Sequence, residues 1–252
     1  MPRTSAIYIR SALFNVLFYV NLTAHMIVAL PTLFLPRRFL HAFVRSYGLT
    51  SLWLLRVVCG TKVEWRGVAK LPKTACILAC KHQSAWETFA LYAVIDDPTY
   101  ILKRELMWLP LFGWYMRKEG LIAIDRSAGM AALARMTTRA RNALAAGRQI
   151  VIFPEGTRRL PGAEPDYKPG LAYLYAKAAV PCVPMALNSG LYWPRRSLLR
   201  LPGTIVVEIL DPIAPGLGKD TFSRRLEDEI EGATARLIQD AARRDQTSGA
   251  LS

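Results

Sequence analysis

Short apolar runs alternate with longer amphipathic segments along the chain beyond Gly60. The runs have the length of strands, and the segments between them have the length and apolar spacing of helices. This alternation is typical of an α/β domain with a largely parallel central sheet flanked by helices. The predicted strands are 62–66, 75–80, 99–102, 120–124, 149–153, 182–187 and 204–210.

The clearest predicted helices lie between these strands and after the last one. They span 84–94, 128–146, 168–179 and 220–243. We therefore expect one α/β domain over residues 59–245, because a chain of 252 residues has room for one large domain. The short segment 246–252 is expected to form a frayed tail.

The pattern differs before residue 58, where a long apolar stretch comes first. Residues 11–35 contain no Asp, Glu, Lys or Arg, and a helix of this length could cross a membrane. Basic residues flank the stretch on both sides, so the positive-inside rule does not favour a single crossing. A helix pair lying in one leaflet fits this symmetry better, with a single transmembrane helix as the alternative. The flanking residues are Arg3, Arg10, Arg37, Arg38 and Arg45.

Residues 37–58 continue as an amphipathic helix in which arginines stand among Phe, Leu and Trp. Such a helix can pack on the main domain, or it can lie at the membrane surface with its arginines on lipid phosphates. The pattern does not separate these alternatives. Residues 1–58 are therefore expected to form an N-terminal, membrane-associated helical segment. A cleaved signal peptide is disfavoured, because the apolar stretch is too long and no small-residue cleavage site follows it.

The composition combines a basic charge with a strongly apolar chain. The 33 Lys and Arg against 19 Asp and Glu give a formal net charge of +14, and 52% of the residues are hydrophobic. This apolar content excludes a disordered polycation. The charge points to an anionic membrane surface, phosphorylated substrates or an acidic protein partner, with nucleic acid as the rival interpretation.

The four cysteines indicate buried thiols in a reducing compartment. They lie mostly in apolar runs and show no CxxC spacing, which argues against a disulfide framework or a zinc ribbon. Cys76, Cys80 and His82 could be imagined around a metal. Cys76 and Cys80 would share a core-facing side of one strand, and no fourth ligand is in sight, so no metal site is expected.

Polar groups follow five of the predicted strands at the point where each strand ends. In open α/β sheets, ligand crevices form at the carboxyl ends of parallel strands, so these groups should converge on one site. That site would hold one imidazole, several cations and carboxylates, which suits proton abstraction next to a bound phosphate. The groups are Lys81-His82, Lys103-Arg104-Glu105, Asp125-Arg126, Pro154 to Arg158, and Asn188-Ser189.

His82 and Glu87 stand five positions apart in the segment KHQSAWETFAL. A carboxylate on the first helical turn could fix the tautomer of a loop imidazole and stabilise the imidazolium that forms when His82 takes a proton. The alternative is structural, because Ser84 to Glu87 also forms a capping-box pattern in which Glu87 reaches back to a backbone amide. The spacing leaves both interpretations open.

The run VIFPEGTRRL is more specific. After a strand that ends in Phe153, it places a carboxylate, a Gly that can take positive φ, a hydroxyl and Arg158 in close succession. A plain turn needs Pro and Gly but not this Arg, whose planar fork suits phosphate oxygens. Arg126 and Lys103 add cations at the same predicted edge of the sheet.

Together these segments resemble the glycerolipid acyltransferase family, in particular its bacterial 1-acylglycerol-3-phosphate (lysophosphatidate) acyltransferases. Four ordered blocks carry the resemblance: His82 with Glu87, the KRELMWLPLFGW and GLIAIDR segments, Phe153 to Arg158, and Val183-Pro184-Met185. The apolar N-terminus fits as well. One departure is that the family usually has Asp at the position of Glu87, which leaves a different acceptor open.

The resemblance implies acyl transfer from an acyl thioester to the sn-2 hydroxyl of lysophosphatidate, giving phosphatidate for phospholipid biosynthesis. His82, held by Glu87, would be the general base. Lys103, Arg126 and Arg158 would hold the acceptor phosphate, and Glu155, Gly156 and Thr157 would shape the pocket and contact the glycerol. Backbone amides near the His82 loop could stabilise the oxyanion.

The resemblance also sets the expected partners and location. The donor would be acyl-CoA or acyl carrier protein, and the acidic surface of the carrier suits a basic enzyme. No cofactor, metal or nucleic acid is implied. The expected location is the bacterial inner membrane, on its anionic surface, with the catalytic domain facing the cytoplasm.

Other functions fit the chain less well. It has no GxSxG elbow for a serine hydrolase and no glycine-rich phosphate loop for a nucleotide fold. An acyltransferase acting on another lysolipid, such as a lyso-ornithine lipid, or on a sugar lipid, remains the main alternative. A non-enzymatic basic lipid-binding or RNA-binding membrane protein would leave HQSAWE and FPEGTR unexplained.

Overall fold

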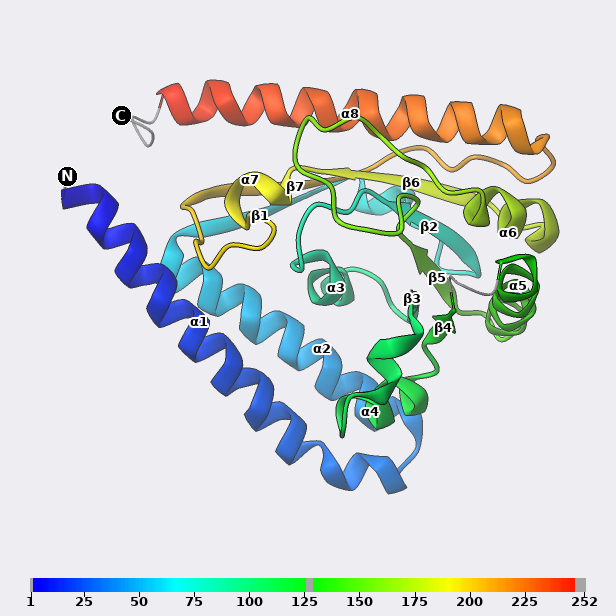
Figure 1. The fold of residues 1–252 in the computed structure, drawn as a ribbon, viewed down its shortest axis with the longest axis horizontal. Helices are drawn as coiled ribbons and strands as arrows, with labels where there is room; N and C mark the ends of the chain where they lie inside the picture. Colours follow the sequence, from blue (N-terminus) through cyan, green and yellow to red (C-terminus); the bar gives the residue numbers. More distant parts are fainter. Residues whose placement is uncertain (1, 126–128, 248–252) are drawn as a thin grey trace.

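A seven-stranded sheet forms the centre of the protein (Figure 1). It is seen in a computed structural model that describes residues 2–125 and 129–247. The strand order is β1-β7-β6-β2-β5-β3-β4, and all seven predicted strands are confirmed within a few residues. The strands are β1 Thr61–Arg66, β2 Cys76–Cys80, β3 Pro98–Lys103, β4 Ile122–Ile124, β5 Gln149–Ile152, β6 Cys182–Leu187 and β7 Gly203–Ile209.

The sheet is largely parallel, as predicted. Strands β6, β2, β5, β3 and β4 run in one direction, whereas β7 pairs antiparallel with β6 and β1 pairs parallel with β7. β2 lies in the middle of the parallel part, with Leu78 paired to Val151 of β5 and to Val183 of β6. The carboxyl ends of the five parallel strands therefore meet at one edge of the sheet.

Helices cover both faces of the sheet (Figure 1). α5, α6 and α8 pack on one face with Ile77 and Ala79 of β2, and α1 to α3 pack on the other with Cys76, Leu78 and Cys80. The helices are α1 Pro2–Val28, α2 Arg37–Leu54, α3 Glu87–Ala90, α4 Phe112–Glu119, α5 Gly129–Ala145, α6 Gly170–Ala178, α7 Ser189–Tyr192 and α8 Lys219–Thr247. Single turns are η1 Leu30–Phe34, η2 Leu55–Cys59, η3 Val68–Lys70, η4 Leu91–Ala93 and η5 Arg104–Trp108.

The ends of the helices differ from the predicted ends. The helix expected over 84–94 starts at Glu87 and becomes a tighter turn after Ala90. α8 continues to Thr247, so residues 246 and 247 are helical rather than part of a frayed tail, and 248–252 lie outside the described residues. In this last turn, Arg244 lies 3.1 Å from the carboxylate of Glu64 in β1.

α1 and α2 form an antiparallel helix pair joined by η1 (Figure 1). The polar residues that interrupt the apolar sequence of α1 face protein. Asn15 donates to the carbonyl of Leu198 at 2.7 Å, and Asn21 donates to the hydroxyl of Ser51 in α2 at 3.1 Å. His25 contacts α2 in the same way. These residues therefore fix how α1 sits on its neighbours.

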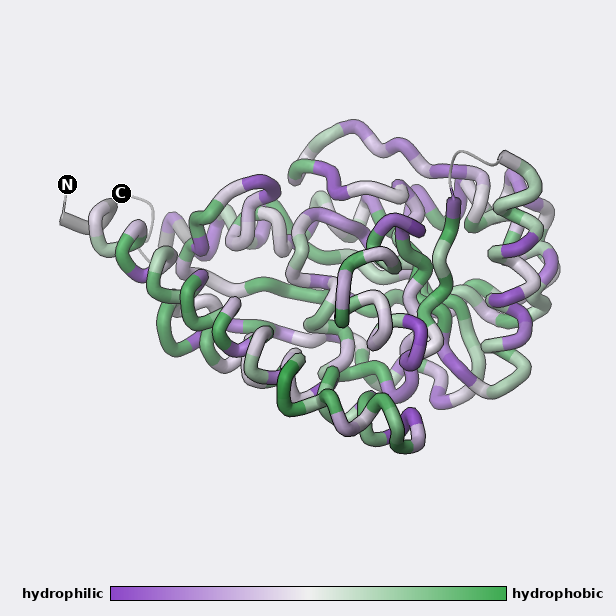
Figure 2. Tube along the Cα trace, turned by 60° about the horizontal axis from the view of Figure 1, so that its bottom comes forward, coloured by the Kyte–Doolittle hydropathy of each residue, from purple (hydrophilic) through white to green (hydrophobic). Residues whose placement is uncertain are grey.

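The outward side of α1 is apolar and exposed (Figure 2). Residues 5–28 are long and apolar enough to cross a membrane by length and composition. The inward side belongs to the core, since Phe14 of α1 and Leu55 after α2 are fully buried. The exposed apolar side chains of α1 are Tyr8, Ile9, Leu13, Val16, Tyr19, Val20, Ile27 and Val28.

An ion-pair network attaches the start of α2 to the main domain. Both terminal nitrogens of the Arg37 guanidinium, Nη1 and Nη2, contact the carboxylate of Asp97, at 2.8 and 2.6 Å. Arg148 reaches the same carboxylate at 3.1 Å. His41 contacts Glu119 at 2.7 Å, and Arg37 lies 3.3 Å from that carboxylate as well. Asp97 and Glu119 are thus engaged with guanidinium groups, and His41 is engaged with Glu119, so the three possible metal ligands already have partners.

Candidate active site

His82 and Glu87 lie at the centre of the parallel part of the sheet. β2 ends at Cys80, and the short loop after it carries His82 before α3 begins at Glu87. This strand–loop–helix path turns the chain back, so two residues five positions apart face each other. The predicted pair is brought together, with His82 Nδ1 3.5 Å from Glu87 Oε2.

The carboxylate of Glu87 is fully buried and accepts several hydrogen bonds. The backbone amides of Gln83 and Ser84 donate to Oε1 at 3.2 and 3.1 Å, and the hydroxyl of Ser189 also donates to Oε1. The Ser84 hydroxyl accepts from the amide of Trp86 at 2.9 Å, and not from the amide of Glu87 as a full capping box requires. Glu87 therefore reaches back to the amide of Ser84, as the capping-box interpretation expects, and also faces the imidazole.

Phe153 holds the ring of His82 from the other side. The two rings stack with their centroids 3.9 Å apart and their planes 15° apart. His82 Nδ1 is buried, and its 3.5 Å separation from Glu87 is longer than a hydrogen bond by about 0.5 Å. A small movement of the imidazole would close that contact and leave Nε2 as the nitrogen able to take a proton.

The loop after β5 is bonded to the His82 loop. Gly156 has φ +64° and donates to the carbonyl of Phe153 at 2.9 Å, which closes the turn. Two residues further, Arg158 is half-buried, and the amide of Arg159 donates to the carbonyl of His82 at 2.8 Å. Thr157 is exposed at the tip of this turn. The structure thus brings Gly156, Thr157 and Arg158 to the same edge of the sheet as His82.

The side chain of Glu155 lies in a buried ion-pair network. Its side chain is fully buried, and Oε1 lies 2.9 Å from the ammonium group of Lys81, which also lies 2.7 Å from Glu231 of α8. Burial raises the pKa of Glu155, although the nearby charge of Lys81 acts in the opposite direction. In this structure Glu155 ties the loop after β5 to the residue before His82, and its contact with the glycerol stays a prediction.

The other predicted cations lie further along the edge. Lys103 at the end of β3 is exposed, and its ammonium group lies 3.2 Å from Glu105. β3 is two strands away from β2, or about 10 Å. Arg126 lies outside the described residues. The five polar groups therefore converge only in part. Those after β2, β5 and β6 meet, whereas two described residues after β3 and β4, Arg104 and Asp125, pair with each other in a separate cluster.

Three residues with clear contacts at the site were not assigned a role from the sequence. Ser189 was noted at a strand end, but its bond to Glu87 depends on the fold. Lys81 precedes His82 in the sequence, but no local pattern predicts that its side chain is buried. Glu231 lies on the charged helix α8, and no sequence motif pointed to it.

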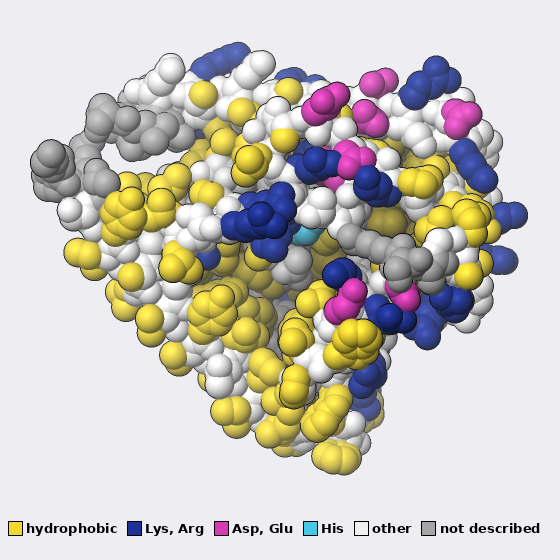
Figure 3. Space-filling view, in the orientation of Figure 1, with side chains coloured by type: hydrophobic (Ala, Val, Ile, Leu, Met, Phe, Trp, Pro, Cys, Tyr) yellow, Lys and Arg dark blue, Asp and Glu magenta, His cyan; other side chains and the backbone are white. Residues whose placement is uncertain are grey.

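The loop amides expected near the oxyanion are already used. The amides of Gln83 and Ser84 donate to Glu87, so they are not available to a developing negative charge in this arrangement. Lys and Arg side chains gather around a hollow on this face of the molecule, beside a histidine (Figure 3). The site therefore offers an oriented base and a cationic surround.

The sequence of this chain is similar to those of known acyltransferases. Residues 62–188 match the sequence model of the family described as Acyltransferase. This range includes His82, Glu87, Phe153 and Arg158 but not Ser189 or Glu231. A Pseudomonas aeruginosa protein named 1-acyl-sn-glycerol-3-phosphate acyltransferase is 38% identical over 204 residues, covering 79% of each chain. A Cocos nucifera protein of the same name is 31% identical over 169 residues, or 66% of this chain and 54% of that one.

The fold is also found in a solved structure. The crystal structure of the 1-acyl-sn-glycerophosphate (LPA) acyltransferase PlsC from Thermotoga maritima matches with a TM-score of 0.78 over 92% of this chain and 98% of that one. The sequence identity is 21%, so this likeness bears on the fold alone. The chain spans about four fifths of the Pseudomonas relative and about half of the coconut relative.

Proposed function

Because this chain belongs to the acyltransferase family and is an acyl-transferring enzyme, we propose that it acylates lysophosphatidate at the sn-2 hydroxyl to give phosphatidate. The observation that carries the proposal is the arrangement around His82. Its imidazole stacks on Phe153 and faces the buried carboxylate of Glu87. Its backbone carbonyl accepts a hydrogen bond from the amide of Arg159, in the loop that carries Arg158. The names of the relatives support lysophosphatidate as the acceptor.

The proposed reaction is a direct transfer without an acyl-enzyme. His82 Nε2 removes the proton from the sn-2 hydroxyl as the oxygen attacks the thioester carbonyl. The tetrahedral intermediate collapses by breaking the carbon–sulfur bond, and the imidazolium returns its proton to the departing thiolate. Glu87 holds the imidazole in the tautomer with Nδ1 protonated and stabilises the imidazolium.

Arg158 is the described cation best placed to bind the acceptor phosphate. It lies in the loop bonded to His82, and its carbonyl is held by Arg195 at 2.6 Å, so the backbone beneath the guanidinium is fixed. Gly156 and Thr157 shape the same turn. We include Lys103 and Arg126 as further cations for this phosphate, on the strength of their positions after β3 and β4.

The acyl donor is proposed to be an acyl thioester of CoA or of acyl carrier protein. The formal charge of +14 favours either of these acidic donors. Transfer to lysophosphatidate would place the enzyme in phospholipid biosynthesis.

The proposed location is the cytoplasmic face of the bacterial inner membrane, with α1 and α2 lying in one leaflet. Phe14 and Asn15 of α1 contact the main domain, so this part of the helix lies beside polar protein. The residues of α1 that follow, 16–28, extend for only about 20 Å, which is short of a hydrocarbon core of about 30 Å. This geometry supports attachment from one side rather than a crossing.

The test of this function is an acceptor assay with purified protein in detergent. Lysophosphatidate and an acylated CoA or carrier protein are supplied, and labelled phosphatidate is measured beside a lyso-ornithine lipid as the rival acceptor. Phosphatidate formation with little acylation of the rival is expected. Preference for the acceptor without a phosphate would contradict the proposal.

The same assay tests the role of Arg158. Arg158→Ala should raise the KM for lysophosphatidate by roughly 10-fold to 100-fold while the KM for the donor changes little, because a charge-assisted hydrogen bond of about 1.5–3 kcal/mol is lost. Arg141→Ala, an exposed arginine on α5, is the matched control. Equal increases for both substrates would show that Arg158 does not select the acceptor.

A further inference from the structure

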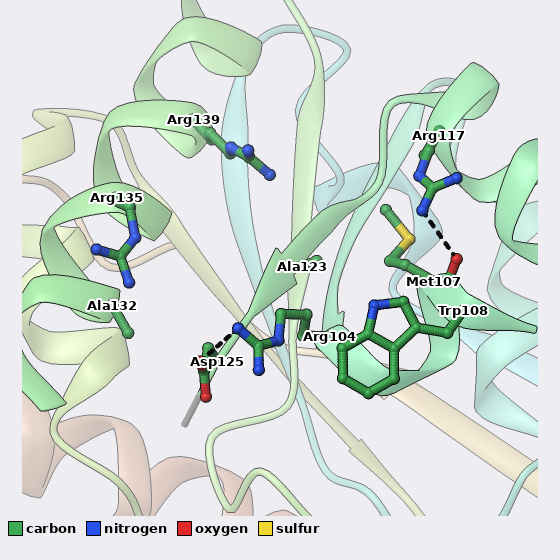
Figure 4. Close-up of a pocket in the computed structure, with 9 residues that line it drawn as sticks. All are labelled: Arg104, Met107, Trp108, Arg117, Ala123, Asp125, Ala132, Arg135 and Arg139. Atoms are coloured by element: carbon green, nitrogen blue, oxygen red, sulfur yellow. Dashed lines mark hydrogen bonds and ion pairs between the residues drawn. The ribbon is translucent and has the colours of Figure 1, made fainter. Parts of the chain in front are cut away.

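A second concave site lies beyond the carboxyl ends of β3 and β4 (Figure 4). It is a cavity of about 380 Å³, within the usual size of small-molecule sites. α5 forms one wall, and the η5 turn with α4 forms the other. Its lining includes Arg104, Trp108, Arg117, Asp125, Arg135 and Arg139.

The charge of this arginine pocket is unbalanced. Four guanidinium groups line it against one carboxylate, a formal excess of +3 from the residues named above. Asp125 is paired with Arg104 at 2.7 Å, and Arg117 donates to the carbonyl of Met107 at 3.2 Å. The other two guanidinium groups of the pocket lie on the facing wall.

Arg135 and Arg139 supply those two groups. They are exposed, one turn apart on α5, and line the pocket opposite Trp108 (Figure 4). No carboxylate of residues 2–125 or 129–247 forms an ion pair with either of them, and α5 itself contains no Asp or Glu. Like charges at this spacing destabilise a helix, so their placement is better explained by an anion that binds between them.

The opposite wall offers a flat aromatic surface. Trp108 is 63% exposed, although a large indole is usually buried, and the guanidinium of Arg104 lies 5.3 Å from its ring centre. An exposed indole beside several arginines can stack on a nucleobase while the guanidinium groups hold phosphates. This combination of features is suited to a phosphorylated nucleotide.

We propose that the arginine pocket binds the 3′-phosphorylated adenosine diphosphate end of an acyl-CoA donor, an inference that rests on the proposed function. CoA carries three phosphates and an adenine, which match several guanidinium groups and one exposed indole. Lysophosphatidate carries one phosphate and no base. A carrier protein would present a folded acidic surface, which does not enter a pocket of this size.

The position of the pocket suits a donor that reaches His82 through a long arm. β4 is three strands from β2 in the sheet, a separation of about 14 Å. The flexible pantetheine arm of CoA would cross the ends of β3 and β5 to bring its thioester to the imidazole. Arg158 lies on the loop after β5, whereas Arg135 and Arg139 lie on α5, so Arg158 stays available to the acceptor phosphate while the arginine pocket holds the donor.

Calorimetric titration of the full chain in detergent with CoA, without any acceptor, tests the proposal. The double variant Arg135→Gln/Arg139→Gln should weaken CoA binding at least about tenfold, since each charge-assisted contact is worth about that factor. Trp108→Ala should weaken it about fivefold or more through lost stacking. Wild type should bind 3′-dephospho-CoA more weakly than CoA, and that difference should shrink in the double variant.

A matched pair of substitutions controls for the loss of net charge. Arg141→Gln/Arg224→Gln removes two exposed arginines outside the pocket and should leave CoA binding within about twofold of wild type. Glycerol 3-phosphate and anionic lipid vesicles serve as probes for the acceptor and for a membrane surface. Their binding should be the same in the pocket variant and in the control.

The outcomes separate this proposal from the proposed function. Unchanged CoA affinity in the pocket variant, or no CoA binding by wild type, overturns the nucleotide site even where phosphatidate is formed from acyl carrier protein. Selective loss of glycerol 3-phosphate or vesicle binding would assign the pocket to the acceptor or to the membrane and also overturns it. Failure to form phosphatidate from either donor would instead reject the proposed function.

Discussion

The carboxylate of Glu87 stabilises the loop that carries His82 as well as facing its imidazole. It accepts hydrogen bonds from the amides of Gln83 and Ser84 and from the hydroxyl of Ser189. A shorter Asp would have to retain these bonds from one methylene further away. The longer side chain therefore fits a site in which one residue both holds the loop before α3 and faces the imidazole.

Glu87→Gln separates these two roles, because the amide keeps the size of the side chain and loses its charge. We expect kcat to fall about 100-fold, less than on removal of His82, with little change in either KM. Glu164→Gln, an exposed acid, is the control for the same chemical change. A kcat within about twofold of wild type would show that the imidazole does not depend on this carboxylate.

Some site residues could be predicted from the sequence because their positions follow from strand ends. His82 and Arg158 each follow a short buried strand, and parallel strands bring such positions to one edge. The role of Glu155 could not be predicted in this way. Its side chain points to Lys81, 74 positions earlier, and Lys81 also binds Glu231, 150 positions later, so the direction of Glu155 depends on tertiary contacts.

At the scale of elements, the strands were easier to predict than the ends of the helices. β2, β5 and β6 are buried along their whole length and appear as continuous apolar runs. The last turn of α8 contacts Glu64 through Arg244, 180 positions away, and no local pattern contains that contact. The helix expected over 84–94 is shorter, because residues 84–86 form a turn and a tighter turn follows Ala90.

The attachment of α2 to the main domain should weaken at acidic pH. Burial alone would raise the pKa of Asp97, but the guanidinium groups of Arg37 and Arg148 outweigh it and hold the pKa below its usual 3.8. A lowered pKa in the folded state adds stability above the unfolded-state value, and this is lost as the pH falls through the folded-state value. The contribution is at most about 1 kcal/mol, because the pair is partly exposed.

Asp97→Asn should therefore lower the melting temperature by about 1–3 °C at pH 7, and its difference from wild type should shrink as the pH falls below 3.8. Melting curves followed by circular dichroism across this range give the comparison. The neighbouring exposed residue provides the control variant Asp96→Asn, which should match wild type throughout. A constant difference between wild type and Asp97→Asn at every pH would rule out the charge of Asp97 as its cause.

At the scale of the whole molecule, the N-terminal helix pair is part of the folded domain as well as a candidate membrane contact. Phe14 and Leu55 lie in the same core cluster as Trp86, next to the His82 loop. Removing the pair would therefore disturb the catalytic domain as well as any attachment. Its role at a membrane is better tested by labelling than by deletion.

Cysteine labels near the start of α1 and near the start of α2 test the orientation of this pair. Ser5→Cys and Arg38→Cys are at exposed positions, and the four native cysteines are buried. In membrane vesicles, an impermeant thiol reagent should reach both new cysteines from the same side as a third cysteine, Arg224→Cys, on the main domain. Labels at residues 5 and 38 that react from opposite sides would show that α1 crosses the membrane.

The central claim is that this acyltransferase uses His82 to deprotonate the hydroxyl of lysophosphatidate. The most direct measurement is phosphatidate formation by the wild type and by His82→Ala, at saturating donor and acceptor. We predict a fall in kcat of about 100-fold to 10,000-fold, with unchanged circular dichroism, because the attacking alcohol loses its base. A folded His82→Ala protein with activity within about tenfold of wild type would contradict this account.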